Sequence, residues 1–122
     1  MLDLGFINEK NELITVEVSE DCYEKLSDLK IYEKVYYKNK DFEIEGEESE
    51  SYYVAELNDD NRTILLKLIE KERHRCLNKL FKQLDDNPTI KEIRKNTYFI
   101  KELTEIYECL NSKNNKFFSY DV

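Results

Sequence analysis

The chain is poor in residues that interrupt regular structure, with two glycines, one proline and no tryptophan among 122 residues. Glycine and proline supply the special backbone conformations of sharp turns, so their scarcity predicts regular elements joined by short polar turns. No segment has the glycine spacing of a phosphate-binding loop or a nucleophile elbow. Nine tyrosines and six phenylalanines supply core material, and the length favours a single domain over residues 1–122.

Residues that ligate metals or act as nucleophiles are also few. His74 is the only histidine, which excludes a multi-histidine metal site. His74 and Cys76 cannot form a nucleophile–base pair, because side chains two positions apart on a helix point away from each other. Cys22, Cys76 and Cys109 are odd in number and form no CxxC pair, so we interpret them as reduced thiols. The sequence predicts no catalytic residue, no metal site and no cofactor, and therefore a protein that is not an enzyme.

Long apolar runs are absent as well. No window approaches the roughly 18 consecutive apolar residues that indicate a membrane-spanning helix. Met1–Asn8 contains no basic segment followed by an apolar run, so it does not have the pattern of a signal peptide. Together with reduced thiols, these features predict a cytoplasmic protein with no membrane partner.

The first half of the chain has the two-residue period of β-strands. In Leu13–Val18 the apolar side chains alternate with polar ones, and Ser19 directly after it is a suitable cap for a short helix. In the segment after a turn at 38–40, the period places Phe42 and Ile44 inward and the neighbouring carboxylates outward. The strands expected from these patterns are Leu2–Ile7, Leu13–Val18, Ile31–Tyr37, Phe42–Glu45 and Tyr52–Leu57.

The second half has the period of amphipathic helices. Asn58–Asn61 is a cluster of helix-capping residues, and Pro88 suits the first position of a second helix. The apolar face expected on the first helix is Leu66, Ile69, Cys76, Leu77, Leu80 and Leu84. On the second helix it is Ile93, Phe99, Ile100, Leu103, Ile106, Tyr107 and Leu110. Residues 111–116 are expected to form a loose linker, followed by an edge strand or a docked segment at 117–120.

These elements predict an α+β fold in which a four- or five-stranded antiparallel sheet precedes a C-terminal two-helix antiparallel hairpin. Within the single domain, residues 1–57 are mainly β with an acidic hairpin region at 41–60. Residues 58–112 form the helical hairpin and 113–122 a tail. The alternative is two small lobes, a sheet and a helical hairpin, joined near Leu57.

Charge is distributed unevenly along the chain. The net charge is −8, yet nine acidic residues and no lysine or arginine occur between Asp41 and Asn61, and the rest of the chain is close to neutral. A surface of one sign attracts a partner of the opposite sign. On a strand, alternate carboxylates would stand about 6.6–6.8 Å apart, comparable to the spacing of phosphates in a nucleic acid. The candidate partner-binding residues are Asp41, Glu43, Glu45, Glu47, Glu48, Glu50, Tyr52 and Tyr53. The alternative is a solvated loop that protects a strand edge.

Two further sequence patterns bear on the binding of a metal ion or a charged partner. Asp41–Gly46 has the first carboxylates of a calcium-binding loop, but the twelfth position is Tyr52 in place of the required glutamate, so we expect no calcium site. Lys71, Arg75, Lys79 and Lys82 fall on one side of the first helix, either as its solvated face or as a stripe that contacts phosphates or an acidic neighbour. The net negative charge argues against direct binding of nucleic acid.

The function predicted from the sequence is a small acidic cytoplasmic protein-binding module. Its acidic region would occupy a basic, nucleic-acid-binding site on another protein. The heavy use of Lys, Asn, Ile and Tyr, whose codons are AT-rich, fits an inhibitor encoded by a phage or mobile element. The alternative is a structural or assembly protein that forms a homodimer through residues 62–110, where Leu77, Phe81, Phe99 and Tyr107 extend the apolar stripes.

Overall fold

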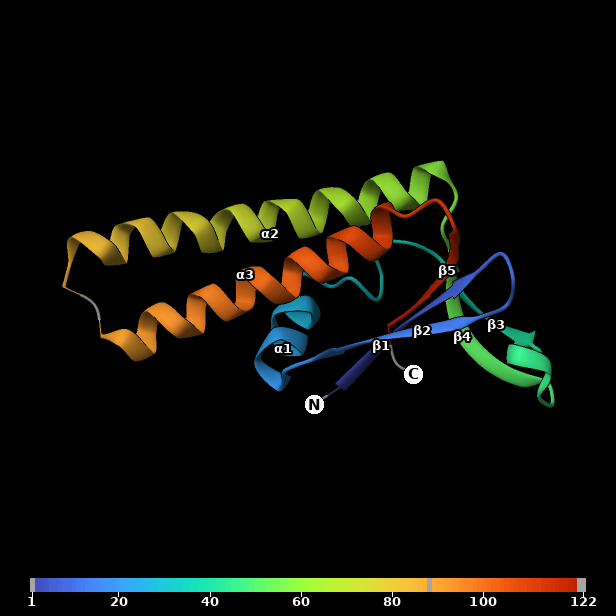
Figure 1. The fold of residues 1–122 in the computed structure, drawn as a ribbon. Coiled ribbons are helices and arrows are strands. Elements are labelled where there is room, and N and C mark those ends of the chain that lie inside the picture. Colours follow the sequence, from blue (N-terminus) through green and yellow to red (C-terminus); the bar gives the residue numbers. More distant parts are fainter. Residues whose placement is uncertain (1, 88, 121–122) are drawn as a thin grey trace.

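A computed structural model describes residues 2–87 and 89–120 and shows a five-stranded antiparallel sheet with a long helical hairpin (Figure 1). This confirms the α+β class and the pair of long helices after the first strands. In chain order the elements are β1 (Leu2–Asn8), β2 (Leu13–Val18), α1 (Glu20–Asp28), β3 (Tyr37–Phe42), the 3-10 turn η1 (Ile44–Gly46), β4 (Glu50–Glu56), α2 (Asp59–Asp85), α3 (Ile90–Asn111) and β5 (Asn115–Ser119).

The sheet has the strand order β2-β1-β5-β4-β3, so its central strand is the last one in the chain. Phe118 on β5 pairs with Phe6 on one side and Ala55 on the other, and its side chain is fully buried. Of the two alternatives expected for 117–120, an edge strand or a docked segment, neither describes this central strand, and the expected linker at 111–116 is shortened because β5 begins at Asn115. The reversal of the chain between α3 and β5 is stabilised by Asn115, the first residue of β5. Its side chain is buried, and its amide donates back to the Cys109 carbonyl in the last turn of α3 at 2.8 Å.

The expected strand Ile31–Tyr37 is mostly a loop, and the expected turn at 38–40 lies inside β3. Ile31 and Val35 are apolar because they pack into the core from this loop, where they are 0% and 8% exposed. The loop is held by the Tyr37 hydroxyl, which donates to the Ile31 carbonyl at 2.9 Å. The prediction of a strand at Ile31–Tyr37 was wrong because a short apolar segment has the same pattern whether it is a strand or a loop that packs into the core.

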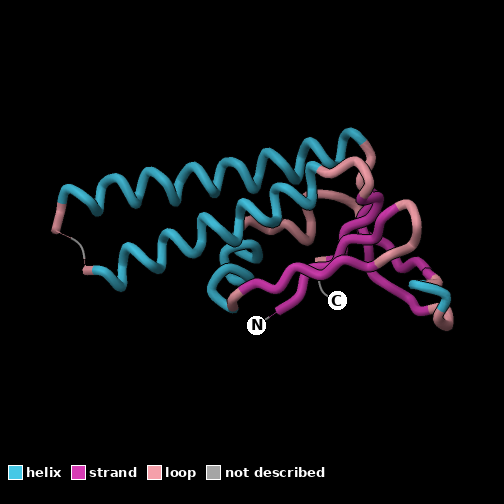
Figure 2. The backbone as a smooth tube through the Cα atoms, in the orientation of Figure 1, coloured by secondary structure: helices cyan, strands magenta, loops and turns pink. Residues whose placement is uncertain are grey.

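The main core lies between the sheet and the three α-helices. Figure 2 shows the strands gathered at one end of the molecule, with the hairpin extending away from them. The largest fully buried side chains of this core include Leu4, Phe6, Leu26, Leu65, Ile69, Leu103, Ile106, Leu110 and Phe118. A smaller cluster, built on Ile7, Phe42 and Val54, covers the other face of the sheet. The two faces separate because successive strand residues point to opposite sides.

The short helix α1 is capped as the sequence predicts, and the cap also attaches it to α3. The Ser19 hydroxyl accepts from the Cys22 amide at 3.2 Å. The Glu102 carboxylate on α3 accepts from the Ser19 amide at 2.6 Å and from its hydroxyl at 2.9 Å. Glu102 is 3% exposed, so this is a buried carboxylate with its acceptors satisfied.

The cluster Asn58–Asn61 caps α2 as expected: the Asn58 side chain accepts a hydrogen bond from the Asn61 amide. Ile69 and Cys76 of the expected apolar face of α2 are buried, and so is Leu65, which was not expected there, while Leu84 near the distal end is 54% exposed. Thr89 caps α3, and Pro88 lies outside the described residues. Within the described part of the chain, no helix combines the length and the apolar character needed to span a membrane.

Candidate protein-binding site

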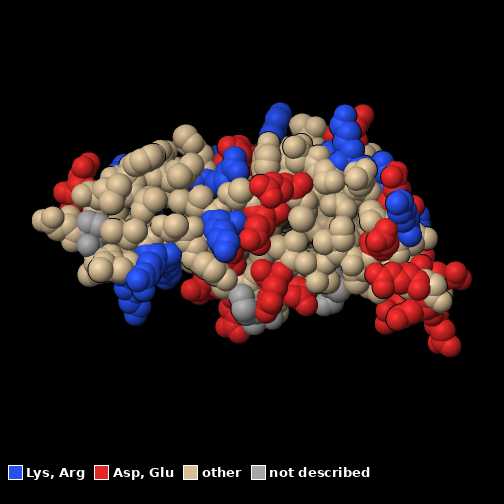
Figure 3. Space-filling view, viewed as in Figure 1, with Lys and Arg blue, Asp and Glu red and all other residues tan. Residues whose placement is uncertain are grey.

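Six exposed carboxylates gather at the turn between β3 and β4, which we call the acidic turn: Asp41, Glu43, Glu45, Glu47, Glu48 and Glu50. Figure 3 shows acidic side chains projecting from this end of the sheet, far from the closed end of the helical hairpin. A hollow of about 590 Å³ is lined by the segment from Gly46 to Glu50. The acidic turn is therefore an exposed, projecting surface of negative charge, with a shallow hollow along Gly46 to Glu50.

The backbone of the acidic turn differs from the expected strand. β3 ends at Phe42, and Glu45 and Gly46 have φ angles of 53° and 78° in the η1 turn. Glycine adopts this left-handed conformation readily, whereas Glu45 adopts it at a conformational cost. Asp41, Glu43 and Glu45 consequently do not form the regular row that a strand would give, so the comparison with phosphate spacing does not hold.

A small apolar cluster fixes the base of the acidic turn. The ring centroids of Phe42 and Phe117 are 5.0 Å apart and Ile44 packs on the same cluster, on the face of the sheet opposite the α-helices. The Lys40 ammonium lies 4.4 Å from the Phe117 ring centroid, a cation–π contact made by the residue that precedes Asp41 in the chain. Packing therefore holds the start of the turn in place while its carboxylates remain in water.

The two tyrosines predicted to accompany the carboxylates lie on opposite faces of the sheet. The Tyr52 hydroxyl donates to Glu50 Oε2 at 2.8 Å, and this hydrogen bond raises the pKa of Tyr52. Tyr53 stacks on Tyr37 with ring centroids 5.6 Å apart, and it is 55% exposed. Only Tyr52 lies with the acidic turn, because adjacent strand residues alternate in direction.

The remaining three of the nine acidic residues occupy the opposite end of β4. Glu56 ends that strand, while Asp59 and Asp60 lie in the first turn of α2. Carboxylates at a helix N-terminus are stabilised by the exposed amide groups and the helix dipole. The acidic segment is thus divided into a binding candidate at one end of β4 and a helix-capping group at the other.

The basic stripe expected on α2 lines a shallow groove, which we call the basic groove: Lys71, His74, Arg75, Asn78, Lys79 and Lys82. His74 is exposed there. Arg75 is partly neutralised by the buried Glu72 carboxylate, 3.3 Å from its guanidinium. Lys25 on α1 lies 3.9 Å from the same carboxylate. The role of the stripe stays a prediction, although its side chains do share one surface.

Among the described residues, no three or more His, Cys, Asp or Glu side chains are grouped so that they could hold a metal ion. Cys22 and Cys76 are buried and Cys109 is half-buried. Burial raises the pKa of Cys22 to about 12, and it also raises the pKa values of Cys76 and Cys109. A raised pKa keeps a thiol protonated and weakly nucleophilic.

A further hollow, between α1 and the hairpin, was missed by sequence reasoning because its side chains come from three helices far apart in the chain. No local pattern brings such residues together. A search for similar proteins found no match to any family model, curated protein or solved structure.

Proposed function

We propose that the protein is a small cytoplasmic binding module, not an enzyme, whose acidic turn engages a basic site on another protein. The observation that carries the proposal is the projection of six exposed carboxylates from one turn. Charges concentrated on a projecting surface produce a directional field that accelerates encounter with a partner of opposite sign and favours that partner over others.

The architecture of the turn supports a binding role. Phe42 and Ile44 fix it on the sheet, so little of its backbone has to be ordered when a partner binds. Tyr52, adjacent to Glu50, adds an amphipathic ring of the kind that is enriched in protein interfaces. In its most specific form, the proposal is that the partner is a nucleic-acid-binding protein of a host cell and that the protein, encoded by a phage or mobile element, blocks its basic groove.

The proposal is tested by reversing charge in the acidic turn. Glu43→Lys, Glu45→Lys and Glu48→Lys in one variant should weaken binding of the captured partner at least tenfold, about 1.4 kcal/mol, without lowering the melting temperature. The matched control reverses three exposed carboxylates on the β1–β2 hairpin, Glu9, Glu12 and Glu17, and changes the net charge equally.

The measurement is affinity capture from lysate with mass spectrometry, followed by titration of the purified partner at increasing salt. A partner that binds wild type and control but not the acidic-turn variant, and that nucleic acid displaces, supports the proposal. Equal capture by all three proteins would refute it. A refolding defect in the acidic-turn variant would also refute it, because it would show that these carboxylates are structural.

A second candidate function is self-association through the helical hairpin. It is favoured by the apolar side chains at the closed end of the hairpin, where Phe81 is 63% exposed, Leu84 54% and Ile90 70%. We call these three residues the hairpin tip. Large exposed apolar side chains grouped in one region are typical of an interface. Light scattering distinguishes the two candidates, since a dimer insensitive to salt requires the hairpin, while a monomer favours the acidic turn.

A further inference from the structure

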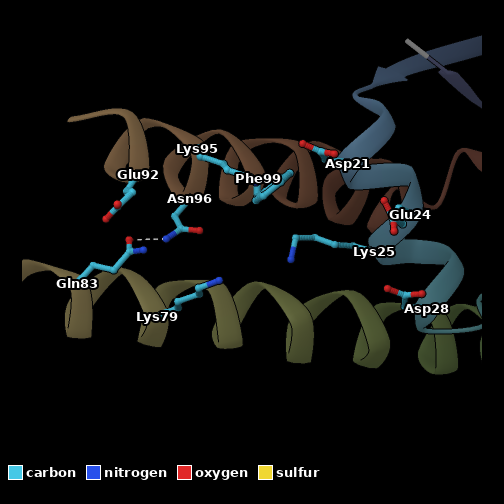
Figure 4. A pocket seen from close by; sticks show the side chains of 10 residues that line it. All are labelled: Asp21, Glu24, Lys25, Asp28, Lys79, Gln83, Glu92, Lys95, Asn96 and Phe99. Atoms are coloured by element: carbon cyan, nitrogen blue, oxygen red, sulfur yellow. Dashed lines mark hydrogen bonds between the residues drawn. The ribbon is translucent and has the colours of Figure 1, made fainter. Parts of the chain in front are cut away.

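A groove of about 430 Å³ separates α1 from the two helices of the hairpin; we call it the α1 groove (Figure 4). Its volume falls in the range of small-molecule sites, and side chains from α1, α2 and α3 line it. It is distinct from the acidic turn, which lies at the β3–β4 end of the sheet. What is bound there therefore does not depend on the proposed function.

Two walls of opposite charge face this groove. Asp21, Glu24 and Asp28 occupy one side of α1, as expected for residues spaced by three or four positions on a helix. On the hairpin side Figure 4 shows two lysines, Lys79 from α2 and Lys95 from α3, together with one carboxylate, Glu92 from α3, so this wall is basic by one net charge. Among the described residues, no ion pair within 4.0 Å joins the two walls.

An aromatic ring lies between the walls. The Lys25 ammonium is 4.8 Å from the Phe99 ring centroid and the Lys95 ammonium is 5.9 Å from it. Lys25 is already compensated by the buried carboxylate of Glu72, 3.9 Å away. Lys79 and Lys95 form no ion pair within 4.0 Å among the described residues, although Glu92 lies one helical turn before Lys95 on the same wall. Lys79 is therefore the more available of the two charges to a ligand.

Beyond the lysines, the groove is closed by a hydrogen bond across the hairpin. The Asn96 side-chain amide, in a residue only 6% exposed, donates to the Gln83 carbonyl oxygen. Figure 4 shows this pair beside Lys79 and Lys95, on the side away from α1. A buried polar pair linking two helices fixes the distance between the walls that those helices carry.

We propose that the α1 groove binds a small zwitterion with an apolar side chain, of the size of an aromatic amino acid. Its ammonium faces Asp21, Glu24 and Asp28, and its carboxylate lies between Lys79 and Lys95. The apolar side chain packs over the small part of the Phe99 ring that lines the groove, since Phe99 is only 5% exposed. A ligand that carries both charges compensates both walls at once, whereas a ligand with one charge leaves the other wall unmatched.

The test uses three probes that share a phenyl-ethyl group. L-phenylalanine carries both charges, 2-phenylethylamine carries only the ammonium and 3-phenylpropionate carries only the carboxylate. Titration of the full-length, nitrogen-15-labelled protein should shift the amide resonances of Lys25, Lys79 and Asn96 with L-phenylalanine. Each single-charge probe should bind at least about tenfold more weakly. No shift up to about 10 mM L-phenylalanine, or equal affinity for the three probes, overturns the proposal.

The same titration, repeated with substituted proteins, tests whether Lys79 and Lys95 form the binding site. Lys79→Gln with Lys95→Gln should weaken L-phenylalanine binding at least about tenfold while leaving the affinity for 2-phenylethylamine unchanged. The matched control, Lys71→Gln with Lys82→Gln, removes two lysines of the basic groove that do not line the α1 groove. An equal loss of affinity in the control would show a general charge effect and overturn the assignment. All four lysines are exposed, so the variants are expected to fold.

Discussion

The two ends of the helical hairpin differ in what covers them. At the base, where the hairpin meets the sheet, Leu65, Ile106 and Leu110 are completely buried. At the hairpin tip, Phe81 and Ile90 are 63% and 70% exposed although they are equally apolar. The same kind of helix is therefore a core element at one end and a bare surface at the other. The base is therefore expected to carry most of the hairpin's contribution to stability, while the tip carries its exposed apolar surface.

The reason lies in the lengths of the elements. α2 has 27 residues, or about 40 Å, whereas the sheet and α1 cover only the part of the hairpin nearest the strands (Figure 1). Helices of globular proteins are stabilised mainly by packing of their apolar face. At the hairpin tip that packing comes only from the partner helix, so the tip contributes little to the fold and keeps its apolar side chains accessible.

The largest expected effect is at the base, from Arg62→Met. The Arg62 guanidinium donates to the carbonyls of Leu57, Leu110, Ser112 and Asn115, which ties the start of α2 to the end of α3 and to β5. Hydrogen bonds from a charged group contribute roughly 1.5–3 kcal/mol each, so we expect a loss on the order of 3 kcal/mol in the free energy of unfolding. Chemical denaturation measures it.

The control for this prediction is Arg94→Met, which makes the same chemical change at an exposed position in the distal half of α3. Its expected cost is within about 0.5 kcal/mol, as for most surface substitutions. Similar losses for the two variants would show that the base and the tip do not differ in the way described above.

Alkaline pH gives a second, intermediate test of the base. Burial of Cys22, on the inner face of α1, raises the pKa of its thiol from 9.0 to about 12. Below pH 9 the thiol is protonated in both the folded and the unfolded chain, and its contribution to stability is complete. Above pH 9 only the unfolded chain releases the proton, so stability falls by roughly 1 kcal/mol per pH unit until about pH 12.

The measurement is the free energy of unfolding between pH 9 and 11. In Cys22→Ala the decline should be shallower than in the wild type. Cys109→Ala, at a half-buried position, should change the slope less. An unchanged slope in Cys22→Ala would mean that the thiol is hydrated and that the base is more open than its side-chain burial indicates.

Local signals in the sequence were sufficient for the elements whose ends are marked by capping residues. Ser19 and Asn58 begin helices because their side chains accept from backbone amides within the next turn, and that information lies within a few residues. The hydrophobic period of α3 likewise identified Phe99, Leu103, Ile106 and Leu110 as core residues. Helices could be predicted because their determinants are close together in the chain.

Long-range features could not be predicted in the same way. The position of β5 between β1 and β4 depends on residues near the start and the middle of the chain, and nothing in Asn115–Ser119 itself distinguishes a central strand from an edge strand. Charge alone singled out the carboxylates of the acidic turn, and their role as a site stays a prediction, but the shape of the turn depends on the left-handed conformation at Glu45 and Gly46. The α1 groove depends entirely on tertiary packing.

The smallest effect on stability is expected at the hairpin tip, from Phe81→Ser with Ile90→Ser. Both side chains are mostly exposed, so their replacement should change the free energy of unfolding by no more than about 0.5 kcal/mol each. If the protein self-associates through the hairpin, the same variant should convert a dimer to a monomer in light scattering at any salt concentration.

A matched change at the base, Leu65→Ala, should cost about 2–5 kcal/mol because that residue is fully buried. A hairpin-tip variant that loses as much stability as Leu65→Ala would show that the tip belongs to the core. A dimer that survives in the variant would exclude the tip as the interface.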